Sequence, residues 1–212
     1  MEGSEIKEEK EAGISEKKKI FVAGATGNTG KRIVEQLLAK GFAVKAGVRD
    51  VDKAKSILPE ANPLLQFVDN IGTVNLVDAC QKLGINRFIL ISSILVNGAA
   101  MGQWFNPVYI ILNAMGLVLV AKLQAEKYIR KSGINYTIIR PGGLKNDPPQ
   151  GNIIMQPEDT LFRGSISRDQ VAEVAVEALL HPESHHKVVE IVASTDVPKR
   201  SFEELFGSIE LQ

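Results

Sequence analysis

Short apolar runs alternate with longer amphipathic segments along most of this chain. Runs rich in Val, Ile and Phe predict buried strands at residues 20–23, 42–48, 64–68, 87–92, 135–140 and 187–193. Apolar residues three or four positions apart predict helices that start after residue 30 and that cover residues 50–58, 71–83, 168–180 and 201–209. Strands that alternate with helices in this way predict an α/β fold with a mostly parallel, doubly wound sheet.

Three glycines, Gly24, Gly27 and Gly30, fill the turn between the first strand and the first helix. A pyrophosphate can approach such a turn because glycine has no Cβ, and the free N–H groups of the helix then face it. The spacing G-x-x-G-x-x-G is longer than the commoner dinucleotide motif, so a tight turn without a ligand stays an alternative. The residues expected to hold the pyrophosphate are Gly24, Thr26, Gly27, Asn28, Thr29 and Gly30.

The second predicted strand ends at Arg49 and Asp50, about 20 residues beyond the glycines. An acidic residue here usually binds the ribose hydroxyl of NAD, whereas an arginine accommodates the 2′-phosphate of NADP. The planar guanidinium of Arg49 suits a phosphate, so we expect NADP, with NAD favoured less. The other interpretation of Arg49 is a solvated loop charge.

The longest apolar stretch covers residues 108–121, in which Asn113 is the one polar side chain. It is shorter than a membrane span, which needs about 20 residues. It continues into the amphipathic residues 122–131, so we expect one long helix, packed on the sheet or at a subunit interface. Contact with a membrane surface is the alternative, and a homodimer is compatible with the apolar face.

Composition narrows the classes of partner. Lysine plus arginine and aspartate plus glutamate both number 25, so no bulk charge favours nucleic acid. The single Cys80 excludes an internal disulfide, and no cluster has metal-ligand spacing, so we expect no metal. Residues 1–18 predict a disordered polar tail ahead of a single domain at 19–212. They carry no visible leader peptide, so a complete N-terminus would predict a cytoplasmic protein.

Several motifs in combination resemble the atypical short-chain dehydrogenase/reductases, which have an NAD(P)H-binding Rossmann domain. The motifs are G-A-T-G-N-T-G at residues 24–30, V-R-D at 48–50, S-S at 92–93, K-L-Q-A-E at 122–126 and R-P-G-G at 140–143. Residues 88–149 are especially similar to an uncharacterised chloroplast member from plants. The resemblance implies a Rossmann-like sheet, a nicotinamide cofactor and a chloroplast location.

The resemblance also implies roles for individual residues. Ser93 and Lys122 match the catalytic Ser and Lys of the family, and Lys122 also matches the lysine that holds the nicotinamide ribose. Ser92, Pro141 and Gly142 match further cofactor contacts. The family's catalytic Tyr is replaced by Val118, which cannot transfer a proton, while Tyr109 lies nine residues earlier and is expected to face elsewhere.

Two functions remain open on these residues. The preserved Ser and Lys favour NADPH-dependent hydride transfer to a small apolar carbonyl or enone, with Lys122 as acid and base. Val118 favours a non-catalytic NADP(H)-binding sensor or scaffold module.

The chain departs from the family pattern between Val68 and Asp69, where members carry roughly 40 or more further residues. Those residues would include a central strand, and the apolar pattern agrees: one strand candidate, where the fold expects two, lies between Asp50 and Arg87. Its loss would leave a space near 10 Å wide, about two strand spacings, or a sheet that has closed up. The chain is therefore expected to lack one central strand.

Overall fold

The computed structural model describes residues 18–48, 56, 62–65, 72–114 and 117–210. Its strands form three sheets. The first is parallel, with the order β1(Lys19–Ala23), β2(Ala43–Val48), β3(Asn62–Leu65). The second has the order β4(Arg87–Ile91), β5(Asn135–Pro141), β9(Lys187–Ser194), β7(Asn152–Pro157), and β7 alone runs antiparallel to its neighbour. The third pairs β6(Gly143–Lys145) with β8(Ser165–Ser167).

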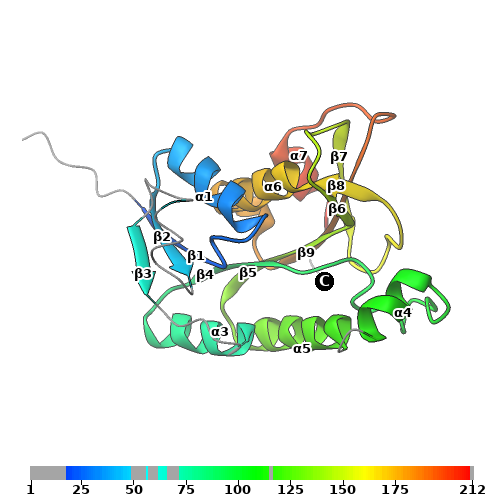
Figure 1. Cartoon of the computed structure of the whole chain (residues 1–212), viewed down its shortest axis with the longest axis horizontal. Helices are drawn as coiled ribbons and strands as arrows, with labels where there is room; N and C mark the ends of the chain where they lie inside the picture. Colours follow the sequence, from blue (N-terminus) through cyan, green and yellow to red (C-terminus); the bar gives the residue numbers. More distant parts are fainter. Residues whose placement is uncertain (1–17, 49–55, 57–61, 66–71, 115–116, 211–212) are drawn as a thin grey trace, which may run out of the picture.

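Helices cover both faces of the sheets (Figure 1). One face carries α1(Gly30–Ala39), α6(Arg168–Leu180) and α7(Phe202–Gly207). The short 3-10 helix η1(Pro182–Ser184) follows α6 along the chain. The opposite face carries α3(Thr73–Lys82) and α5(Val118–Lys131), with α4(Pro107–Ala114) at one end. This is the Rossmann-like, mostly parallel α/β fold that the sequence predicts.

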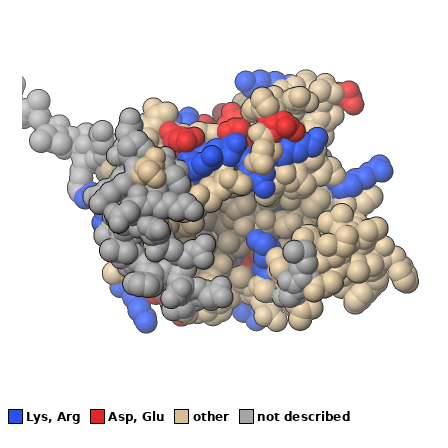
Figure 2. Space-filling model, in the orientation of Figure 1, with Lys and Arg blue, Asp and Glu red and all other residues tan. Residues whose placement is uncertain are grey.

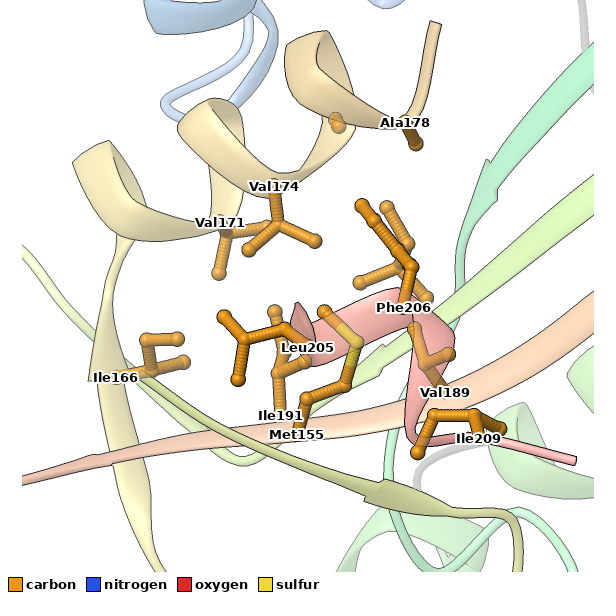
Figure 3. Packing of buried hydrophobic residues seen from close by; sticks show 12 residues of the cluster. Met155, Ile166, Val171, Val174, Ala178, Val189, Ile191, Leu205, Phe206 and Ile209 are labelled. Carbon is orange, nitrogen blue, oxygen red and sulfur yellow. The ribbon is translucent and has the colours of Figure 1, made fainter. Parts of the chain in front are cut away.

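The central core lies between β5, β9 and the helix pair α6 and α7 (Figure 3). Val189 and Ile191 of β9 share one buried cluster with Val171 and Val174 of α6, and Phe206 of α7 is fully buried in it. Helix α6 starts where predicted because Ser167 accepts a hydrogen bond from the Gln170 N–H, while the Gln170 side chain accepts from the Ser167 N–H. This reciprocal cap satisfies donors that the helix start would otherwise leave unpaired.

The two large sheets do not pair with each other in the described part of the chain. Strand β1 is hydrogen-bonded to β2, and β4 to β5, but no described strand joins β1 to β4. No residue of β4 is fully buried, whereas most of β5 is, and Phe21 of β1 is 37% exposed. The structure therefore agrees with the predicted loss of a central strand and shows separate sheets.

Helices α1 and α6 connect the two halves across this break. Arg32 of α1 pairs with Asp169 of α6 at 2.9 Å, and Lys40 pairs with Glu177 at 2.8 Å. Val176 of α6 also belongs to the apolar cluster beneath α1. The helix layer thus holds the β1 sheet against the β4 sheet.

One predicted element is wrong. The expected long helix over residues 108–131 is two helices, α4 and α5, whose axes differ by 86°. The residue before α5, Leu117, has a φ of 56°, in the left-handed region that an α-helix cannot include. Strands β6, β7 and β8 lie between residues 143 and 167, where the apolar runs predict no strand. The predicted helix at 50–58 lies outside the described residues apart from Ser56.

Candidate functional site

The glycine turn after β1 is the first part of the site, and each glycine has its own reason. Gly24 has a φ of 68°, which L side chains rarely adopt. The Gly27 N–H donates to the Gly24 carbonyl at 2.9 Å and closes the turn. A Cβ on Gly30 would lie 2.2 Å from the Gly24 oxygen, so any other residue would push α1 away from the turn.

The start of α1 suits a negatively charged group. Thr29, the residue before the helix, makes no side-chain cap, and the first turn contains no acidic residue, while the Lys31 N–H donates to the Gly27 carbonyl at 3.0 Å. Nothing lies within 4 Å of the position that a Cβ on Gly24 would take, so space is open beside the turn. Uncapped donors, open space and a positive dipole end together fit a pyrophosphate.

The neighbourhood of the turn is fixed by Arg32. Its guanidinium donates to the Asn28 carbonyl at 2.6 Å and also pairs with Asp169. The turn is thus held at the Asn28 carbonyl. Arg49 and Asp50, the residues expected to select NADP or NAD, lie outside the described residues.

The second part of the site lies where β4 ends. Ser92 is buried, and its hydroxyl donates to the Glu126 carboxylate at 2.5 Å. Ser93 is half-buried, and its hydroxyl has no partner among the described residues. Of the two serines that match the family motif, Ser93 is therefore the one free to contact a substrate, while Ser92 is committed to Glu126.

A buried charge cluster lies behind these serines, and Arg140 of β5 is its centre. The guanidinium donates to both oxygens of Glu126, with a shortest distance of 2.6 Å, and to Asp159 at 2.7 Å. It also reaches Glu158 and Glu190, each at 3.3 Å. Burial alone would lower the pKa of Arg140, but the hydrogen bonds and charge of Glu126 outweigh it and raise that pKa. The cluster fixes α5 to the end of β5.

Glu190 of β9 extends the cluster to a loop. Its carboxylate accepts the backbone N–H groups of Asp159, Thr160 and Leu161 at 2.6–3.1 Å. Burial raises the pKa of Glu190, although these N–H groups and Arg140 act in the opposite direction. Asp159 in turn accepts from the Asn97 side chain at 2.7 Å. The loop after β7 and the segment after β4 are therefore held together.

Lys122 lies one helical turn before Glu126 on α5. Burial lowers the pKa of its ammonium, while the negative charge of Glu126 raises it by a smaller amount. Its amine makes no hydrogen bond or ion pair in the part of the chain that the structure describes. Leu119 and Leu123, on either side of it, belong to an apolar cluster with Ile94, Leu95 and Val96, the segment that follows the serines.

The position that matches the family's catalytic tyrosine carries no proton donor, because Val118 has an aliphatic side chain. Val118 is the first residue of α5 and is 37% exposed. The Tyr109 ring packs partly buried against the Ile94 cluster, and a Cβ on Gly98 would lie 2.5 Å from it. Tyr109 therefore has a packing role.

Pro141 and Gly142, at the end of β5, make backbone hydrogen bonds to neighbouring segments. The Pro141 carbonyl accepts from the Ile94 N–H at 3.1 Å, and the Gly142 N–H donates to Ile191 at 2.9 Å. A Cβ on Gly142 would lie 2.7 Å from the Gly164 carbonyl oxygen. The glycine is thus required for close packing, whatever its contact with a cofactor.

Glu126, Arg140 and Glu190 are not among the site residues predicted from the sequence. A usable signal is present for Glu190, which is one acid inside the run V-V-E-I-V. Buried charges need partners, so a charge within an apolar strand indicates a network. Glu126 and Arg140 do lie inside the quoted family motifs.

A cavity of about 290 Å³ lies elsewhere, between β6, β8 and the end of β9. Its lining includes Lys145, Gln170 and Thr195 but none of the residues discussed above as candidates for cofactor binding or catalysis. The cavity is therefore separate from both parts of the site.

Comparison with known proteins identifies the family and the fold. A family model described as NAD(P)H-binding matches residues 24–70 and 60–182, two stretches that overlap around the position where the sequence predicts the missing segment. A chloroplastic, uncharacterised protein of Arabidopsis thaliana is 60% identical over 235 positions, which cover 92% of this chain and 84% of that protein. The alignment is longer than the 212 residues of this chain, so that relative has residues without a counterpart here.

Two further comparisons concern more distant proteins. Sanguinarine reductase of Eschscholzia californica is 30% identical over 149 positions, which cover 67% of this chain and 52% of the reductase. The structure of a short-chain dehydrogenase/reductase from Veillonella parvula, in complex with NADP, superposes with a TM-score of 0.69 at 20% identity. That match covers 87% of this chain and 99% of the other, and it concerns the fold.

Proposed function

The chain belongs to the NAD(P)H-binding family, and we propose that it is an NADPH-dependent reductase that transfers hydride to a small apolar carbonyl or enone. A nicotinamide dinucleotide is the cofactor of this family. Its pyrophosphate would lie on the glycine turn, held by residues 24–30, and Arg49 would bind the 2′-phosphate. Lys122 would contact the nicotinamide ribose, beside Ser92, Pro141 and Gly142.

The observation that carries the proposal is the half-buried Lys122 amine, which has no partner among the described residues. It lies on α5, the helix that contacts Ser92 through Glu126 and packs through Leu119 and Leu123 on the segment that follows the serines. A lysine whose pKa is lowered by burial gives up its proton more readily than an ordinary lysine. This property suits a general acid where tyrosine is absent. Ile94 and Leu119 are buried in the apolar cluster next to Lys122, so the surroundings of the lysine are apolar, which favours an apolar substrate.

The proposed chemistry needs three contributions. When bound, the reduced nicotinamide supplies the hydride to the electrophilic carbon. The Ser93 hydroxyl donates a hydrogen bond to the substrate oxygen and stabilises the negative charge that develops there. The Lys122 ammonium gives its proton to that oxygen, so that the product is an alcohol or, from an enone, a saturated ketone after tautomerisation.

Single-turnover oxidation of bound NADPH by a panel of aldehydes and quinones tests this proposal. Lys122→Ala is expected to lower the rate by a factor of about 10²–10⁴, the usual contribution of general acid catalysis. Lys127→Ala, an exposed lysine on the same helix, is the matched control and should keep the rate. A Lys122→Ala variant that keeps the rate would refute the catalytic role of Lys122.

The second candidate is a non-catalytic NADP(H)-binding module, which Val118 in place of the tyrosine favours. In that case NADPH would bind, with a change in its fluorescence, but no member of the panel would oxidise it. We propose the chloroplast as the compartment for either function, because the Arabidopsis relative is chloroplastic.

A further inference from the structure

The surface around α4 is apolar and exposed to an unusual degree. We define the α4 patch by its large exposed side chains, which are Trp104, Phe105, Val108, Ile110, Ile111, Leu117 and Val118. Phe105 is 91% exposed and Trp104 is 61% exposed. Figure 2 shows the end of the molecule that carries α4 in Figure 1 as mostly uncharged surface, while charged side chains gather over α1 and α6. Apolar surface of this extent indicates an interaction site.

The sequence around the patch contains no charge at all. From residue 88 to residue 121 there is no Asp, Glu, Lys, Arg or His. Interfaces between soluble proteins normally have a polar, partly charged rim around an apolar centre. A surface formed by such an uncharged run is better matched to a partner that is itself apolar over a wide area.

Helix α4 is apolar around its whole circumference. None of its eight residues is buried, and Asn113 is its one polar side chain. Tyr109 and Leu112 anchor one side to the Ile94 cluster, while Val108, Ile110 and Ile111 remain exposed. A protein partner covers one side of such a helix, whereas lipid covers every side that the protein leaves open. Helices that are apolar all round occur in cores and in membranes.

We propose that the α4 patch docks this protein on a lipid surface, with α4 lying in the boundary between headgroups and acyl chains. Trp104, which is 61% exposed, suits this boundary because tryptophan concentrates there. No single described helix is long and apolar enough to cross a bilayer, and the pair α4 and α5, which together reach the length and composition of a span, is bent by 86°. Because the patch is uncharged, docking is driven by apolar burial, so it needs no anionic lipid and resists salt. It also needs neither cofactor nor catalysis.

Trp104 makes the test direct, because it is the one tryptophan in the chain. Vesicles of phosphatidylcholine are added to the full-length protein, and tryptophan emission is followed. The expected result is a blue shift of the emission, with quenching by lipids brominated on the acyl chains. Both effects should persist when salt is raised, and sedimentation with the vesicles should follow the same binding curve.

Two double variants distinguish docking through the α4 patch from non-specific hydrophobic adsorption. Phe105→Ser with Ile111→Ser is expected to lower the vesicle partition coefficient about tenfold or more, because two large apolar side chains leave the lipid. Leu83→Ser with Ile85→Ser changes two exposed apolar side chains after α3 and should leave the partition coefficient unchanged. Circular dichroism establishes that both pairs fold.

Three results would overturn the proposal. The first is an emission spectrum of the unchanged protein that stays constant with vesicles, a result that does not depend on any variant folding. The second is a blue shift without lipid that grows with protein concentration, together with a dimer in sedimentation, which would assign the patch to a second copy. The third is vesicle binding that requires anionic lipid and disappears with salt.

Discussion

Replacing Arg140 with methionine tests the buried charge cluster. Methionine keeps much of the volume of arginine and removes the guanidinium that pairs with Glu126 and Glu190, which are 1% and 0% exposed. Removing one partner of a buried ion pair costs about 3–5 kcal/mol, because the remaining charge stays buried without a counterion. A protein of this size commonly has about 5–15 kcal/mol of stability in all. Arg140→Met is therefore expected to lower Tm by about 6–20 °C.

The effect should depend on pH in a defined direction. Burial raises the pKa of Glu190, so the native state binds this proton more readily than the unfolded chain does. Ionising Glu190 consequently reduces stability as pH rises through its raised native pKa, and Arg140 offsets that loss. Without Arg140, the variant loses the full amount of stability at neutral pH, where Glu190 is ionised. The loss of stability becomes smaller as the pH falls toward the ordinary pKa of a glutamate and Glu190 is protonated.

Urea unfolding followed by circular dichroism at about pH 7 and about pH 5 measures both effects, as the difference in unfolding free energy between variant and unchanged protein. Arg163→Met makes the same substitution at an exposed arginine and should stay within about 0.5 kcal/mol. A loss below about 1 kcal/mol for Arg140→Met at neutral pH, similar to that of Arg163→Met, would show that the cluster is solvated and the reasoning wrong.

Two predictions concern the cofactor. Gly30→Ala places a Cβ 2.2 Å from the Gly24 oxygen, so we expect it to remove the rise in Tm that NADP⁺ gives the unchanged protein; a preserved rise would contradict the close packing of α1 on the turn. Arg49→Ala should weaken NADP⁺ binding by about 10–100-fold, the value of a hydrogen-bonded charge, and leave NAD⁺ nearly unchanged, as measured by calorimetry. Equal losses for the two cofactors would remove the role of Arg49 in selecting the 2′-phosphate.

Local sequence signals predicted much of this fold. The strands β1, β2, β4, β5 and β9 follow from apolar runs, and α6 follows from its period together with the Ser167 cap. The break between α4 and α5 could not be predicted, because no local rule assigns a left-handed backbone to Leu117. Strands β6 and β8 contain three residues each, and their pairing comes from chain segments about 20 residues apart.

The site divides in the same way. The glycine turn, Ser93 and Lys122 are recognisable from motifs that lie within short stretches of sequence. The Arg140 cluster is not, because its partners lie 14 to 50 residues away along the chain and meet through packing alone. Sequence showed that Ser92 and Ser93 are adjacent, but the contact with Glu126 was needed to tell a structural serine from an available one.

The separation of the β1 sheet from the β4 sheet has a consequence for how the molecule unfolds. In an unbroken sheet, hydrogen bonds between central strands make the two nucleotide-binding halves melt together. Here the described connection is made by helices: α1 contacts α6, including the two ion pairs Arg32–Asp169 and Lys40–Glu177, and Ile33 of α1 packs on the central core. Each half can therefore open by itself, and amide hydrogens of β1 should exchange with solvent sooner than those of β5. A dinucleotide that reaches from the glycine turn to Lys122 would contact both halves, and its binding would make them unfold cooperatively.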